Sequence, residues 1–198
     1  MANILLSDLF IEILGAFTGL IYLYFSIRRS VWLWPLGLIT ALFYIYVFFN
    51  AKFYAGFSLQ FYYLGISIYG WFYWTRGKKE NQENSRPVVK ANFRELLVFI
   101  MIIGFLTLLS GYALDNYTDS PLPYWDAFTT AGGIVATWML ARKYLEHWLF
   151  WIVIDLVSLG TYVYKELYPT VILFAAYTIM AIVGYYQWKK AIVINSGH

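Results

Sequence analysis

Residues 148–155 read Trp-Leu-Phe-Trp-Ile-Val-Ile-Asp, and they lie in an apolar run of about twenty residues, the length that a helix needs to cross a bilayer. An ionisable side chain in the middle of such a run is energetically costly. It usually marks the path of a substrate or an ion. The stretch therefore predicts a membrane-spanning helix that carries a functional acid, Asp155.

The polar and aromatic side chains of this run share one face of the predicted helix. Their spacing of three or four residues is that of a single helix face. The face carries two indoles, a carboxylate, a hydroxyl and a phenol, from Trp148, Trp151, Asp155, Ser158 and Tyr162. The apolar side chains of the remaining surface, available to lipid or neighbouring helices, are Leu149, Ile152, Val153, Leu156, Val157 and Leu159. We expect the polar face to bind a small, ring-containing, cationic molecule.

The composition of the chain is that of an integral membrane protein. Its 198 residues are 61% hydrophobic and only 13% charged. The 19 Tyr, 16 Phe and 9 Trp exceed what interfacial belts need, so some rings are expected to line an interior cavity. The absence of Cys excludes disulfides, thiolate metal sites and Cys nucleophiles. The net charge of +3 comes from basic loops between apolar spans, which does not indicate a nucleic-acid partner.

Seven apolar spans are predicted, and the fold class is therefore all-α integral membrane, in contact with the lipid bilayer. They cover residues 8–27, 30–50, 54–75, 93–114, 122–142, 146–165 and 167–190. We expect a first three-helix bundle over 1–75, a cytoplasmic loop plus linker helix over 76–121, and a second three-helix bundle over 122–198.

The basic residues predict the orientation of these spans. Seven crossings place twelve Lys and Arg residues on one side and only Lys52 and Lys165 on the other. Cytoplasmic loops are enriched in Lys and Arg, so the amino terminus is expected outside and the carboxyl terminus inside.

The chain also repeats itself. A shift of 114 residues aligns residues 12–74 with 126–188, and it matches Trp34 with Trp148 and Gly70 with Gly184. Two three-helix copies separated by one extra span point the same way in the membrane. This 3+1+3 arrangement is that of parallel-repeat transporters, which bind substrate near the midplane between the repeats.

The two copies differ where a site is expected. Trp151, Asp155 and Ser158 correspond to Gly37, Ala41 and Tyr44, so the second copy holds the charge and the first offers space. Further candidates for substrate contact are Thr40 in the second span, Gln60, Tyr63 and Ser67 in the third, and Tyr177 in the seventh.

Each candidate also has a purely structural interpretation. Trp148 lies close to two basic residues and can be an interfacial anchor. Asp155 can be a buried acid bonded to a neighbouring helix, and Gln60 can serve the same purpose. The Thr40 hydroxyl can bond its own helix. Tyr63 and Tyr177 are equivalent in the repeat and can either flank a ligand or pack in the core.

The sequence lacks the motifs that several catalytic activities require. The chain has no Gly-rich phosphate loop and no His-Glu-x-x-His motif, and its only histidines are His147 and His198. We therefore expect no enzymatic activity, no metal centre and no cofactor.

The chain resembles the Pnu vitamin transporters over nearly its whole length. The resemblance rests on Trp148-x-x-Trp151-x-x-x-Asp155, on the preceding Arg142-Lys143-Tyr144, and on residues 68–71 and 123–126. The resemblance implies that Trp148, Trp151 and Asp155 contact the substrate. It also implies facilitated diffusion of nicotinamide riboside, as in members of the PnuC type, with an intracellular kinase trapping the product without required contact. Close relatives carry thiamine or riboflavin.

The chain departs from the family pattern at three positions. Members often have Asn where this chain has Asp155, Thr40 and Ser67. Nicotinamide riboside and thiamine are both aromatic cations, which suit cation–π contact with indoles. The sequence therefore predicts an importer of a cationic B vitamin in the bacterial inner membrane, with nicotinamide riboside first and thiamine second. The alternatives are a riboflavin carrier, a SWEET-like sugar carrier, and the substrate-binding subunit of an ATP-driven importer; the chain also permits homo-oligomers.

Overall fold

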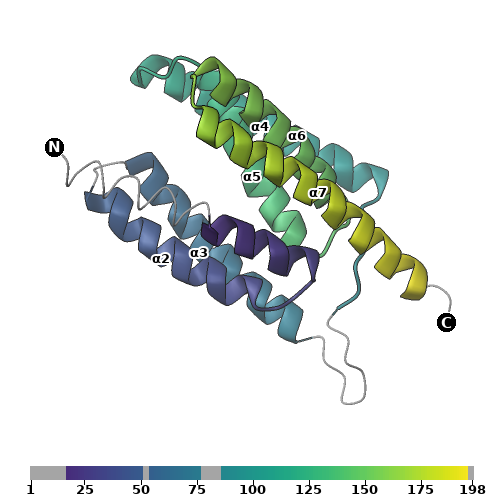
Figure 1. The fold of residues 1–198 in the computed structure, drawn as a ribbon. Coiled ribbons are helices and arrows are strands. Elements are labelled where there is room, and N and C mark those ends of the chain that lie inside the picture. The colour runs from purple at the N-terminus through teal and green to yellow at the C-terminus, as the bar shows by residue number, and fades with distance from the viewer. Residues whose placement is uncertain (1–16, 51–53, 77–85, 196–198) are drawn as a thin grey trace. The chain divides into compact units, whose positions relative to one another are not determined.

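The computed structural model describes residues 17–50, 54–76 and 86–195, and the described backbone is almost entirely helical (Figure 1). A helical stretch, Phe17–Ile27, precedes six longer helices. These are α2 (Leu33–Asn50), α3 (Tyr54–Thr75), α4 (Phe93–Tyr117), α5 (Pro123–Ala141), α6 (His147–Tyr164) and α7 (Tyr168–Asn195). The helices match the seven predicted spans to within a few residues, except that residues 8–16 of the first span lie outside the described ranges.

Three of the described helices are both long and apolar enough to cross a membrane by themselves. They are Phe93–Tyr117, His147–Tyr164 and Tyr168–Ile192. Phe17–Ile27 and Leu33–Phe49 are apolar but shorter. The predicted class, an all-helical membrane protein, is confirmed by these helices.

The chain divides into two compact units, Met1–Phe72 and Tyr73–His198. In the first unit, α2 and α3 lie against one another through small residues. The indole of Trp34 covers Gly70, where an added Cβ would lie 2.4 Å from the ring. Gly37 lies against Ser67 in the same way, with the hydroxyl 2.8 Å from the position of an added Cβ. At Gly70 an added side chain would have to displace the Trp34 ring, whereas at Gly37 rotation of the Ser67 hydroxyl relieves the shortest contact.

In the second unit, the helices pack in chain order. α4 packs on α5, α5 on α6, and α6 on α7. α4 begins at a capping box, in which Asn92 and Glu95 each bond the other's backbone N–H. The small residues of α5 permit close approach, and its Ala131, Val135 and Met139 form a core with Ile103 of α4.

Two helix ends share one hydrogen-bond pattern, which the end of α6 at Glu166 also adopts. Ser30 N–H donates to Phe25 O and Arg29 N–H donates to Ser26 O; Tyr144 N–H donates to Met139 O and Lys143 N–H to Leu140 O. This is the Schellman pattern, in which the residue after the helix is left-handed. Arg29 and Lys143 take that conformation, with φ of 55° and 59°. The paired positions are 114 residues apart, which is the shift that aligns the two segments in the sequence.

Candidate functional site

The predicted polar face of α6 is the buried face of that helix. Asp155 and Ser158 are 4% and 5% exposed, and Trp151 is half-buried one turn before the acid. On the opposite side, Val153 and Leu156 are 51% and 53% exposed. The division of α6 into a buried polar face and an exposed apolar face therefore agrees with the sequence pattern.

Asp155 is the acid at the centre of this face. Within the described part of the chain its carboxyl group has no hydrogen-bond partner and no basic partner. Burying a charge or a polar group without a partner is unfavourable, so such a group is usually completed by a ligand or by water. The alternative interpretation, an acid bonded to a neighbouring helix, has no supporting contact among these residues.

Trp148 lies two turns before Asp155 on α6, in a closed cluster of four rings that we call the aromatic floor: Trp74, His147, Trp148 and Trp188. All four side chains are fully buried. The Trp148 ring centroid lies 4.5 Å from that of His147 and 5.9 Å from that of Trp188. Trp148 also covers Gly184, where an added Cβ would lie 2.6 Å from the indole. In this conformation Trp148 is not an exposed interfacial anchor, and no part of its ring is open to a ligand.

The aromatic floor retains unused polar atoms. His147 Nδ1 lies 2.6 Å from Tyr144 O, which requires the proton on Nδ1 and leaves Nε2 as an acceptor. That Nε2 and the N–H donor Trp148 Nε1 are both buried without a hydrogen-bond partner among the described residues. The floor can therefore accept one hydrogen bond and donate another.

The segment before α4 that contains Arg86 and Val89 is hydrogen-bonded to the turn between α5 and α6. Val89 N–H donates to Lys143 O over 3.0 Å, and Leu145 N–H donates to Val89 O over 2.8 Å. Lys143 Nζ donates to Arg86 O over 2.8 Å and lies 4.2 Å from the Trp74 ring centroid. We call these contacts the Lys143 clasp.

The sequence gives little sign of the clasp. It marks Lys143 as a charge on the cytoplasmic side, yet the side chain is only 1% exposed. Nearby, the Tyr144 hydroxyl donates to Glu95 Oε1 over 2.8 Å. Burial and this hydrogen bond raise the pKa of Tyr144, which keeps the phenol a donor.

The remaining candidate in the second unit is Tyr177 on α7. Its side chain is half-buried, and its ring contacts Phe174 edge-on at 5.6 Å. Phe174 in turn stacks on Tyr162 of α6, with ring centroids 5.1 Å apart. The three rings thus link α7 to the end of the polar face of α6.

The candidates in the first unit gather at α2 and α3. Ser67 is 4% exposed and lies against Gly37, while Thr40 and Gln60 are half-buried. Tyr63 is half-buried beside Tyr62, with ring centroids 5.5 Å apart. The pair of Gly37 and Ser67 was not anticipated as a contact, although the repeat identified Gly37 as the position that offers space.

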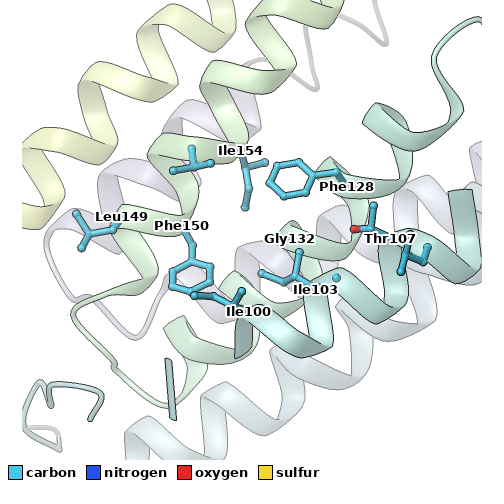
Figure 2. A pocket seen from close by; sticks show the side chains of 11 residues that line it. Ile100, Ile103, Thr107, Phe128, Gly132, Leu149, Phe150 and Ile154 are labelled. Atoms are coloured by element: carbon cyan, nitrogen blue, oxygen red, sulfur yellow. The ribbon is translucent and has the colours of Figure 1, made fainter. Parts of the chain in front are cut away.

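A cavity of about 610 Å³ lies between α4, α5 and α6 (Figure 2). None of the predicted site residues lines it, and its wall from α6 is the face opposite Asp155. Among the described residues no three His, Cys, Asp or Glu side chains are grouped to hold a metal ion.

Comparison with known proteins identifies the family of the chain. Residues 9–190 match the family described as "Nicotinamide mononucleotide transporter". The chain belongs to this transporter family. The family is one of transporters and not of enzymes, in agreement with the expectation from the sequence, and the chain is a multi-pass membrane protein.

Several relatives are similar in sequence to this transporter over most of its length. It is 24% identical to "Nicotinamide riboside transporter PnuC" of Escherichia coli (strain K12) over 202 residues, which is 90% of this chain and 84% of the relative. It is 30% identical to "Riboflavin/roseoflavin transporter RibM" of Streptomyces davaonensis over 152 residues, 74% of this chain and 69% of the relative. In fold it is similar to the "Crystal structure of the Vitamin B3 transporter PnuC", with a TM-score of 0.69 and 21% identity, over 89% of this chain and 79% of that one.

Proposed function

We propose that this transporter imports a small cationic B vitamin across a bacterial inner membrane, and that the vitamin is nicotinamide riboside. Relatives named as nicotinamide riboside transporters support the substrate class. The observation that carries the choice of a cation is Asp155, a buried acid without a partner in the described chain, on the same helix face as Trp151. A cationic ring would supply the missing charge to the acid and a stacking partner to the indole.

We further propose that the ligand contacts Trp151, Asp155 and Ser158 of α6 and Tyr177 of α7. Gln60, Tyr63, Ser67 and Thr40 would complete the site from the other repeat. Trp148 would meet the ligand only after a change in the aromatic floor, because its ring is fully buried in this conformation. Transport would be facilitated diffusion, with a cytoplasmic kinase retaining the product and no contact between kinase and transporter.

The runner-up substrates are riboflavin and thiamine. The 30% identity to a riboflavin/roseoflavin transporter favours riboflavin, whereas the unpartnered acid favours either cation over this neutral ring system. The 3+1+3 parallel repeat with seven crossings is our inference for the architecture. It is supported by the shared Schellman pattern at Arg29 and Lys143 and by the two Trp–Gly contacts.

The substrate is tested by uptake into liposomes that contain only the purified transporter, without ATP or an ion gradient. We expect saturable uptake of labelled nicotinamide riboside and not of riboflavin, thiamine or a sugar. Trp151→Ala should raise the substrate concentration for half-maximal uptake by about 2- to 30-fold. This is the equivalent of losing a cation–π contact of about 0.5–2 kcal/mol. Asp155→Ala should raise this concentration at least as much.

The control for both variants is Leu156→Ala, on the exposed face of the same helix, which should transport normally. Normal transport by Trp151→Ala and Asp155→Ala would show that the site is misassigned. Saturable uptake of riboflavin, without uptake of nicotinamide riboside or thiamine, would make riboflavin the substrate. A requirement for ATP and a second protein would instead indicate a substrate-binding subunit.

The orientation is tested separately by reporters fused to the two ends of the chain. We expect the amino terminus outside and the carboxyl terminus in the cytoplasm, as an odd number of crossings requires. Both reporters in one compartment would overturn the seven-crossing repeat without affecting the substrate assignment.

A further inference from the structure

The cavity between α4, α5 and α6 lies where two helices pack on a shared neighbour while their own backbones stay apart. α4 and α6 each pack on α5, and no Cα atom of α4 lies within 8 Å of one of α6. At Gly132 of α5 an added Cβ would lie 2.8 Å from Ile154 Cγ1, so α5 and α6 approach closely there. On α4, an added Cβ at Gly104 would have no atom within 4 Å. The space in Figure 2 is therefore a gap between α4 and α6, with α5 as its back wall.

The lining of this cavity is apolar apart from one atom. Ile, Leu, Val, Phe and Gly residues form the wall together with Thr107. The Thr107 oxygen is buried and has no hydrogen-bond partner in the described part of the chain. A buried water usually makes two to four hydrogen bonds, and a single hydroxyl does not meet that need. The lining therefore suits neither water nor a charged vitamin, and it fits a hydrocarbon.

The mouth of the cavity lies on the exposed apolar surface of two candidate membrane spans. Ile100 and Leu108 on α4 are 60% and 66% exposed, and Leu149 and Val153 on α6 are also exposed. Both helices are among the candidate spans. Ile100 and Leu108 are eight residues apart, which is about 12 Å along the helix and well within a hydrocarbon core of about 30 Å. The cavity is thus continuous with an exposed apolar surface that is short enough to lie wholly at the depth of lipid tails.

We propose that this cavity binds an acyl chain of a membrane phospholipid, inserted between α4 and α6 and resting on α5. The acyl chain supplies the packing that α4 and α6 do not give each other. It makes no demand on Thr107, whose hydroxyl can reach the carbonyl one turn back by rotation of the side chain, in the way that the Thr137 hydroxyl bonds Gly133 O over 2.7 Å. Because α6 carries Asp155 on its other face, the bound chain supports the helix that bears the proposed site without touching substrate.

The test uses the full-length protein in liposomes that contain a phosphatidylethanolamine with a photoreactive diazirine in the middle of one acyl chain. After illumination, peptide mass spectrometry should find adducts at the deep residues Ile103, Thr107 and Ile154. These adducts should exceed those at Ile172 and Ile179, which are exposed on α7. Equal labelling of the deep and the α7 residues would overturn the proposal.

Gly104→Phe places a ring in the cavity and should reduce the deep adducts about tenfold, equivalent to about 1.4 kcal/mol of binding. The matched control is Gly65→Phe, since an added Cβ at Gly65 also meets no atom within 4 Å and Gly65 is exposed on α3. It should leave the adducts unchanged. If Gly104→Phe does not give a folded protein by gel filtration, Gly104→Leu replaces it with the same expectation.

Thr107→Leu distinguishes an acyl chain from a ligand that needs the hydroxyl. Deep adducts should persist or increase in this variant. Their loss would contradict an acyl chain and indicate a ligand with a polar group. Deep adducts that are absent in the native protein while the transporter self-associates would assign the cavity to a second copy instead. None of these outcomes depends on which vitamin is transported.

Discussion

The turn after Phe17–Ile27 and the turn between α5 and α6 have the same backbone and different surroundings. Both end a helix in the Schellman pattern, both place a basic residue at positive φ, and both are followed by a Trp that covers a Gly. Arg29 is nevertheless exposed, whereas Lys143 is buried beneath the segment that contains Val89.

The comparison shows that local sequence sets the shape of a turn and that distant sequence sets its environment. The hydrogen bonds that define each turn join residues no more than five apart. Lys143 Nζ, in contrast, bonds a carbonyl 57 residues away. Four predictions test how far the two segments related by the 114-residue shift are alike, in order of expected effect.

The largest effect should come from Gly184→Ala and Gly70→Ala. Each would bring a methyl group within 2.6 Å of an indole, Trp148 in one unit and Trp34 in the other. We expect a loss of about 3 kcal/mol in the free energy of unfolding. The midpoint of thermal unfolding in detergent should fall by about 6–12 °C.

Gly65→Ala is the control for both, because its Cβ enters open space and should stabilise the helix by up to about 1 kcal/mol. In a Trp148→Phe background, Gly184→Ala should cost less than it does alone, since the smaller ring leaves room. Additive costs would show that the indole is not the obstacle.

The next effect should come from Lys143→Met, compared with Arg29→Met. Lys143→Met removes a charged donor to Arg86 O and the ammonium above Trp74, and it should cost about 2 kcal/mol. Arg29→Met, at the exposed turn, should stay within about 0.5 kcal/mol of the native protein.

Hydrogen exchange at the Val89 and Leu145 amides measures the clasp directly, because both amides bond across it. Their exchange should accelerate in Lys143→Met and not in Arg29→Met. Equal effects of the two variants would mean that the Lys143 clasp adds nothing to the turn.

A smaller effect of opposite sign should come from Arg29→Gly. A non-Gly residue at positive φ costs about 1–2 kcal/mol, part of which Gly recovers despite its own entropic cost. We expect a net gain of about 0.5–1 kcal/mol in thermal unfolding. Lys143→Gly should lose stability instead, because the same relief comes with loss of the clasp. A gain at both positions would contradict the difference between the turns.

The smallest effect concerns an ion pair in the second copy. Lys165 Nζ lies 3.0 Å from Asp126 Oδ1, and both side chains are partly exposed. The first copy has Ala51 at the position equivalent to Lys165, so it cannot form this pair. Lys165→Met should cost only about 0.2–1 kcal/mol, and less at high salt. A cost that is unchanged between 0.05 and about 1 M salt would show that Lys165 acts through packing.

The sequence by itself determined the helices, the membrane class and the face of α6 that is buried. These follow from the length and periodicity of apolar residues, which act over one or two helical turns. The 114-residue shift also predicted which residues would occupy equivalent turns, because the same local residues form the same local hydrogen bonds.

Only the tertiary structure decided which partners those residues meet. It buried Trp148 in the aromatic floor, placed Lys143 under a distant carbonyl and left a gap between α4 and α6. The periodicity of a helix shows which side is apolar, but not which other helix, loop or lipid covers it. That choice depends on how closely particular side chains allow neighbouring helices to approach, which is a property of the packed molecule.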